Sequence, residues 1–167
     1  MIFRKSVESD VSKIMSIIKQ AQANFKAQGI DQWQNGYPNE EVIMHDIQKE
    51  ESYVLVKDDE VLATIAISFN KEKSYMNIIE GEWLTDGDYG VIHRIAVNNN
   101  YKGLGLSHKL LKYTEEICLE SGIHSIKLDT HEDNTPMRSL LKKNGFEYCG
   151  IIYLESGGKR VAYEKTF

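Results

Sequence analysis

The sequence predicts a mixed α/β (α+β) fold, in which helices cover both faces of a mixed sheet of about seven strands. Two observations predict it. Apolar residues alternate in some segments and recur at helical spacing in others, and these segments are interspersed along the chain. The resulting order is β-α-α-β-β-β-α-β-α-β-β. At 167 residues, the whole chain 1–167 is expected to form one domain.

The first half of the chain contains strand and helix patterns with clear punctuation. Weak alternation predicts an opening strand, and a helix follows that Ser9 or Asp10 caps and Gly29 ends. Asn39 is a typical cap for a second helix, and Asp58-Asp59 marks the turn of a hairpin. The expected elements are a strand at 2–7, helices at 11–25 and 40–47, and strands at 52–57 and 61–69.

The second half begins with a segment, 75–84, whose periodicity is ambiguous. Beyond it, one helix is expected to start near Leu104 or Gly105 and to end at Gly122. Asn134 or Thr135 is expected to cap the last helix. The other expected elements are strands at 90–97, 125–130, 146–154 and 160–167, of which the last two form a hairpin through Ser156-Gly157-Gly158.

The composition excludes several classes of protein. The chain has 20 Lys and Arg against 25 Asp and Glu, and this negative balance argues against a nucleic-acid partner. No apolar run is typical of a secretory signal or long enough for a membrane span. Cys118 and Cys149 are too few for a disulfide framework, and His131-Glu132-Asp133 lacks the paired ligands of a metal site. We therefore expect a cytoplasmic protein without a metal or a membrane partner.

Charge is distributed unevenly along the chain. Residues 98–114 contain three lysines and no acid, whereas 27–48 and 75–93 each contain four acids and no Lys or Arg. One segment is therefore suited to an anion, and two others could face a cation.

The segment from His93 to Lys112 combines a strand, a turn, a glycine-bearing loop and a helix. Gly103 and Gly105 allow close approach of a ligand, and free amides at a helix N-terminus favour a pyrophosphate. The Walker A pattern is absent, and His108 replaces the third glycine of a Rossmann fingerprint. A glycine-bearing turn without a ligand is the alternative reading.

The segment resembles motif A of the GNAT superfamily of acyl-CoA N-acyltransferases, Q/R-x-x-G-x-G/A. The matching residues are Lys102 to Ser107, in which lysine replaces Gln or Arg and serine replaces the small residue. Residues 94–97 look like the preceding fourth strand. Residues 134–146 resemble motif B, N-x-x-A/M-x-x-L-Y-x-x-x-G-F, and the element order also matches. The resemblance implies that the sheet is twisted and mostly antiparallel.

The resemblance implies acetyl-CoA as cofactor. The loop amides of motif A would hold the pyrophosphate, the fourth strand would pair with the pantetheine arm, and the motif B asparagine would contact the cofactor. The implied cofactor-binding residues are Ile95, Ala96, Val97, Lys102, Gly103, Leu104, Gly105, Leu106, Ser107 and Asn134.

The resemblance also implies direct attack of an amine on the thioester in a ternary complex, with the Ile95 amide as a donor to the oxyanion. His93 is the candidate general base, because it shares a strand face with Ile95 and has a suitable ordinary pKa. A histidine hydrogen-bonded inside the sheet is the alternative, and Glu82 and Asp88 are other candidate bases.

The general acid is not identified by motif B. The family's tyrosine position holds Leu141, which cannot donate a proton. Tyr153 or Tyr89 are candidate substitutes. The missing tyrosine also favours a second reading, a catalytically inactive acyl-CoA-binding sensor, and a purely partner-binding domain is a third.

The acceptor is expected to bind at the two acidic stretches. In this fold it enters between the loop at 28–41 and the loops before the fourth strand, so a cationic primary amine, free or on a peptide, is favoured. Trp33 and Tyr37 are candidate substrate-binding residues. The alternative is that this segment is a surface loop anchored by one buried aromatic residue. The sequence is also compatible with a homodimer.

Overall fold

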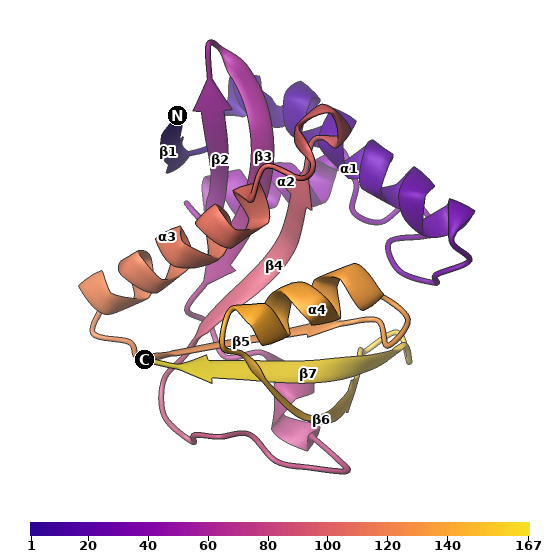
Figure 1. The fold of residues 1–167 in the computed structure, drawn as a ribbon, viewed down its shortest axis with the longest axis vertical. Coiled ribbons are helices and arrows are strands. Elements are labelled where there is room, and N and C mark those ends of the chain that lie inside the picture. Colours follow the sequence, from indigo (N-terminus) through magenta and orange to yellow (C-terminus); the bar gives the residue numbers. More distant parts are fainter. The chain divides into compact units, whose positions relative to one another are not determined.

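The computed structural model describes all 167 residues. Its strands follow the order β1-β2-β3-β4-β5-β7-β6 in a seven-stranded sheet (Figure 1). The ladders β1–β2, β2–β3, β5–β7 and β6–β7 are antiparallel, and β4–β5 is parallel. The expected mixed fold, mostly antiparallel sheet and element order are confirmed.

Contacts divide the chain into two compact units. Unit 1 comprises Met1–Ile67 and His93–Tyr113, and unit 2 comprises Ser68–Ile92 and Thr114–Phe167. Two elements run from one unit into the other: β4 (Gly90–Val97) and α3 (Leu106–Glu120).

In unit 1, three strands are covered by helices on both faces. Its complete elements are β1 (Ile2–Lys5), α1 (Val11–Ala27), α2 (Glu40–Gln48) and β2 (Ser52–Lys57), followed by β3 (Glu60–Ser68). Ile14 of α1 and Ile43 of α2 pack against Val54 on one face. On the other face, Phe3 stacks between Tyr53 and Tyr113, with ring centroids 5.1 and 4.4 Å away.

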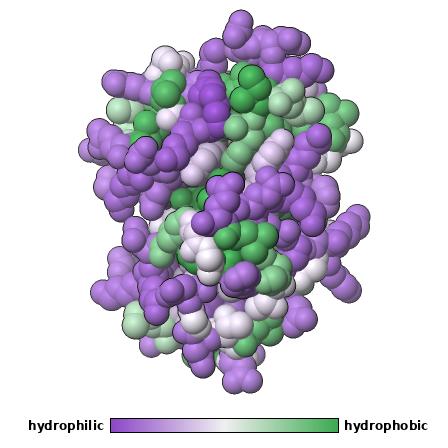
Figure 2. Space-filling model, turned by 90° about the vertical axis from the view of Figure 1, so that its left-hand side faces the viewer, coloured by the Kyte–Doolittle hydropathy of each residue, from purple (hydrophilic) through white to green (hydrophobic).

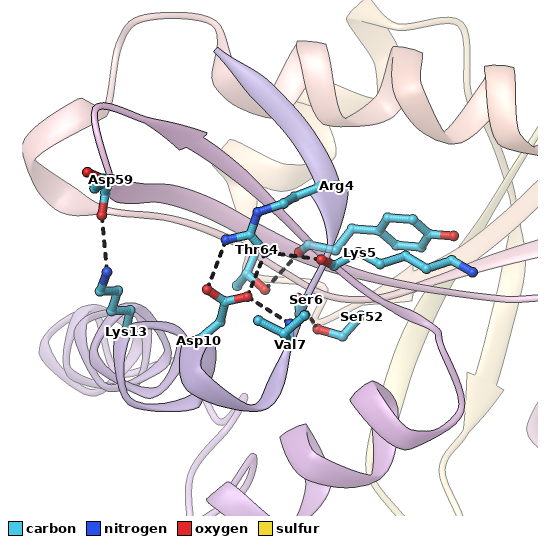
Figure 3. A network of polar contacts seen from close by, with 10 residues as sticks. Arg4, Lys5, Ser6, Val7, Asp10, Lys13, Ser52, Asp59 and Thr64 are labelled. Atoms are coloured by element: carbon cyan, nitrogen blue, oxygen red, sulfur yellow. Dashed lines mark hydrogen bonds and ion pairs between the residues drawn. The ribbon is translucent and has the colours of Figure 1, made fainter.

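The start of α1 differs from the expected cap. Asp10 precedes the helix, but its side chain caps no helical amide. It accepts the Val7 amide at 2.8 Å and both Nη atoms of Arg4 at 2.8 and 3.1 Å (Figure 3). The carboxylate therefore closes the turn between β1 and α1 and holds it to the edge strand.

Unit 2 holds the C-terminal part of the sheet. Its elements are β5 (Ser125–Thr130), α4 (Thr135–Lys143), β6 (Glu147–Tyr153) and β7 (Lys159–Thr166). On α4, Arg138 donates to the Tyr163 hydroxyl of β7 at 2.9 Å. The helix thus lies on the sheet face that Tyr163 presents.

The ambiguous segment forms no regular strand. Residues 69–89, here called the strap, contain one 3₁₀ helix, Lys73–Asn77, and pair with β6 through Ile79 and Ile151. Fully buried Glu164 of β7 accepts the amides of Leu84 and Thr85 at 2.8 and 3.4 Å. These bonds bind the strap to the sheet of unit 2.

A buried lysine lies beneath the strap. Lys127 of β5 is 4% exposed, and its Nζ lies 4.6 and 4.2 Å from the ring centroids of Trp83 and Tyr89. It donates to the Thr85 carbonyl at 3.3 Å. Burial lowers the pKa of Lys127, and the aromatic faces and carbonyl compensate its desolvation in part.

Figure 2 shows a face dominated by hydrophilic residues, with apolar residues in small groups. No helix of the molecule is both long and apolar enough to cross a membrane. No group of three or more His, Cys, Asp or Glu residues is arranged to hold a metal ion.

Candidate active site

The glycine loop between β4 and α3 is open to solvent. Lys102 to Gly105 are exposed, and α3 begins at Leu106, slightly later than expected. Gly103 and Gly105 have φ of 82° and 74°, a conformation that favours glycine, and no atom lies within 4 Å of an added Cβ at either. Successive backbone amides next to a helix N-terminus, with exposed Lys109 one turn later, suit an anion.

A positive φ interrupts β4 directly before the residues expected to pair with the cofactor. Arg94 has φ 49°, which is rare and costly for a residue with a side chain. Its Nε and Nη2 donate to the two carboxylate oxygens of Asp46 on α2, both at 2.6 Å. Its Nη1 donates to the Tyr37 hydroxyl at 2.9 Å. The Arg94 and Asp46 side chains are only 14% and 5% exposed, so the ion pair is buried.

His93 lies half-buried next to this cation. Burial, with a smaller contribution from the Arg94 charge, lowers the pKa of His93 to about 4. The imidazole is therefore neutral at pH 7, and it is a weaker base than an ordinary histidine.

The loop between α1 and α2 carries both candidate substrate residues, but they differ in environment. Trp33 packs against the apolar core of unit 1 and meets Phe25 edge to face at 5.8 Å. Tyr37 is 44% exposed, and Gln22 of α1 donates to its carbonyl at 2.9 Å. Trp33 is thus partly buried against the core, while the Tyr37 ring is exposed.

The motif B residues lie in unit 2. Asn134 is buried and caps α4 by accepting the Met137 amide at 3.3 Å, and its Nδ2 donates to Thr130 at 3.1 Å. Leu141 is fully buried and serves packing. Of the candidate acids, Tyr153 is 50% exposed, whereas Tyr89 is buried and its hydroxyl accepts the Glu72 amide at 3.0 Å.

The candidate cation-binding acids divide into two groups. Glu82 and Asp88 on the strap are exposed, as are Asp31 and Glu40 in the first acidic stretch. Asp46 is not available to a ligand, because Arg94 occupies both of its oxygens. The sequence analysis missed this pair because it joins residues 48 positions apart; its only local signal was the polar interruption of an apolar strand.

Comparison with known proteins assigns the chain to a family. The model of the acetyltransferase (GNAT) family matches residues 18–146, and the chain belongs to this family. A GNAT-family acetyltransferase structure from Streptococcus agalactiae superposes with a TM-score of 0.90, at 34% identity over 99% of this chain and 95% of that one. The uncharacterized N-acetyltransferase YesJ of Bacillus subtilis is 25% identical over 87% of this chain and 81% of its own length.

Two further relatives bear on ligands. The S-alkylcysteine N-acetyltransferase of Bacillus subtilis is 24% identical over 92% of this chain and 80% of its own length. The PaiA N-acetyltransferase of Thermoplasma acidophilum, solved in complex with coenzyme A, shares the fold with a TM-score of 0.72, at 17% identity over 99% of this chain and 98% of that one. Coenzyme A is the family's cofactor, and the open, cationic glycine loop fits its pyrophosphate.

Proposed function

We propose that this protein transfers an acetyl group from acetyl-CoA to a primary amine by direct attack in a ternary complex. The observation that carries the proposal is the exposed loop at 102–105, with left-handed glycines and free space at the start of α3, in a chain of the GNAT family. Acetyl-CoA supplies the reactive thioester. Lys102 to Ser107 and Ile95 to Val97, all in unit 1, would hold it.

His93 is the proposed proton acceptor. With a pKa of about 4, it is a poor match for an ammonium group, whose proton is held far more tightly. The amine therefore has to arrive unprotonated, and His93 takes the proton that the nitrogen releases as its bond to carbon forms. The Ile95 amide would donate a hydrogen bond to the carbonyl oxygen on which negative charge develops.

The proposed acceptor is a cationic amine. Exposed Asp31 precedes α2, and exposed Glu40 and Glu41 form its start. The strap carries Glu80, Glu82, Asp86 and Asp88, all exposed. Either group of acids would attract a cationic group that the acceptor carries in addition to the reacting amine. Either group would also repel phosphorylated acceptors.

The test compares cofactor binding and turnover. The wild type and Gly105→Glu are compared in two measurements. Calorimetry gives the affinity for CoA, and release of free thiol from acetyl-CoA gives the turnover of a panel of amines. A carboxylate at this position should abolish CoA binding, because it would occupy the phosphate site. Gly122→Ala is the control: it is another left-handed glycine with open space around it, at the far end of α3.

The thiol assay suits this protein. Burial raises the pKa of Cys118 to about 12 and that of Cys149 to about 11, so neither thiol competes in the readout. Unchanged CoA affinity in Gly105→Glu would rule out the loop as the binding site. CoA binding without turnover of any amine would favour the second candidate, an inactive sensor, which the buried Leu141 at the usual tyrosine position supports.

A further inference from the structure

Three elements of unit 1 meet at the Arg94 guanidinium. Asp46 approaches it from α2, Tyr37 from the loop between α1 and α2, and the arginine itself stands on β4. The two bonds of 2.6 Å to Asp46 form a parallel, bidentate pair, the arrangement in which arginine binds a carboxylate most strongly. With side chains that are only 14% and 5% exposed, the pair is largely removed from water.

Arg94, one member of this pair, is also the residue of β4 that has a left-handed backbone conformation. A left-handed residue with a side chain persists only where its surroundings hold it. All three guanidinium nitrogens of Arg94 are held in hydrogen bonds, so a backbone change at this residue would strain these bonds. The direction of the next amide, that of Ile95, depends on the same conformation.

The pair also holds Tyr37 at the surface. The Tyr37 oxygen accepts from Arg94, which orients the hydroxyl, and Gln22 fixes the residue's main chain from α1. Tyr37 donates its own proton to no group of the protein. A tyrosine with an exposed ring, a fixed oxygen and an uncommitted proton is prepared to donate a hydrogen bond to a ligand.

We propose that Asp46 and Arg94 are positioning residues that hold the β4 conformation and aim the Tyr37 hydroxyl at an oxygen atom of the amine acceptor. This inference rests on the proposed function. It favours primary amines that also carry a carbonyl, carboxylate or hydroxyl oxygen, because such an oxygen accepts the bond from Tyr37 while the amine nitrogen reacts.

The kinetic test uses two dicationic amines of equal chain length, lysine amide and 1,5-diaminopentane, of which only the first carries an oxygen. We expect the wild type to prefer lysine amide. Tyr37→Phe, which leaves the Arg94–Asp46 pair intact, should raise KM for lysine amide about tenfold, with kcat and KM for acetyl-CoA within about twofold. The preference over diaminopentane should disappear.

Asp46→Asn tests the pair itself. We expect a loss of about 10²-fold in kcat/KM for the amine, including a fall in kcat, because both Tyr37 and the Ile95 amide lose their support. Asp10→Asn is the matched control. It breaks the second bidentate Arg–Asp pair of unit 1, which joins β1 to the turn before α1 (Figure 3) and serves no proposed catalytic group, so kcat/KM should stay within about twofold.

A second readout separates this inference from the proposed function. Hydrogen exchange of residues 28–39 should accelerate in Asp46→Asn and stay at the wild-type rate in Asp10→Asn, whether or not either amine is turned over. An inactive wild type would overturn the acetyltransferase proposal alone. Equal exchange in the two variants, or wild-type kinetics in Tyr37→Phe, would overturn the positioning role.

Discussion

At the scale of single residues, two neighbours on β4 show how burial selects charge states. Arg94 stays charged because Asp46 and Tyr37 compensate its desolvation, and these partners raise its pKa. His93 gains no such compensation from its neighbour, whose positive charge adds to the cost of a second one. One buried cation is thus balanced, and the adjacent imidazole is kept neutral.

The lowered pKa of His93 predicts an unusual pH dependence of activity. The kcat/KM of the wild type should show no fall near pH 6.5 caused by His93, because this group is protonated only near pH 4. His93→Gln should lower kcat by about 10²-fold while CoA affinity stays constant.

The measurement is a pH series of kcat/KM from 4.5 to 9, with the His93 ring followed by NMR. A ring that titrates near pH 6.5 would contradict the environment described here. Wild-type turnover in His93→Gln would instead leave His93 with a structural role inside the sheet.

At the scale of elements, the strap depends on two glycines at which backbones touch. A Cβ on Gly81 would lie 1.9 Å from the Cys149 carbonyl oxygen, and one on Gly150 would lie 2.6 Å from the Ile79 oxygen. Backbone atoms cannot move aside as flexible side chains do. The pairing of Ile79 with Ile151 in β6 therefore requires glycine at both crossing points.

Gly81→Ala should consequently destabilise the protein by about 1–3 kcal/mol, the usual cost of overpacking. Gly87→Ala, also in the strap, is the control, because no atom lies within 4 Å of its added Cβ and its φ is ordinary. Its effect should stay within about 0.5 kcal/mol. Urea unfolding measures both, and equal stability of the two variants would contradict the close approach.

At the scale of the whole molecule, stability should fall in acid through identifiable groups. The Arg4 guanidinium lowers the pKa of Asp10, so the unfolded chain binds this proton more readily than the native protein. The stabilisation is complete above the ordinary pKa of an aspartate and is lost as the pH falls through the lower, native value. Burial raises the pKa of Asp129, which acts in the opposite direction.

We therefore expect the free energy of unfolding to decrease more steeply between pH 4 and 2.5 in the wild type than in Asp10→Asn. Asp59→Asn should behave like the wild type, because Lys13 contacts the main-chain oxygen of Asp59 and not its carboxylate (Figure 3). Urea titrations at several pH values measure these slopes. Parallel curves for the wild type and Asp10→Asn would show that the Arg4 pair does not contribute.

The sequence by itself determined the element order, the cap at Asn39 and the glycines that end α1 and α3. It narrowed the cap of α4 to Asn134 or Thr135, and the structure has Asn134. These features follow from local spacing and from backbone preferences that act over a few residues. The glycine loop belongs to the same class, since its amides and its free space come from one short segment.

Only the tertiary structure decided the charge states and partners around the loop and β4. Asp46 read as a free acid in an acidic stretch, and it is a buried partner of Arg94. His93 read as a base of ordinary pKa, and burial makes it a weak one. Trp33 and Tyr37 were predicted alike as substrate-binding residues, and packing separates a partly buried indole from an exposed phenol ring. Desolvation and ion pairing depend on which distant segments meet, and local spacing carries no record of that.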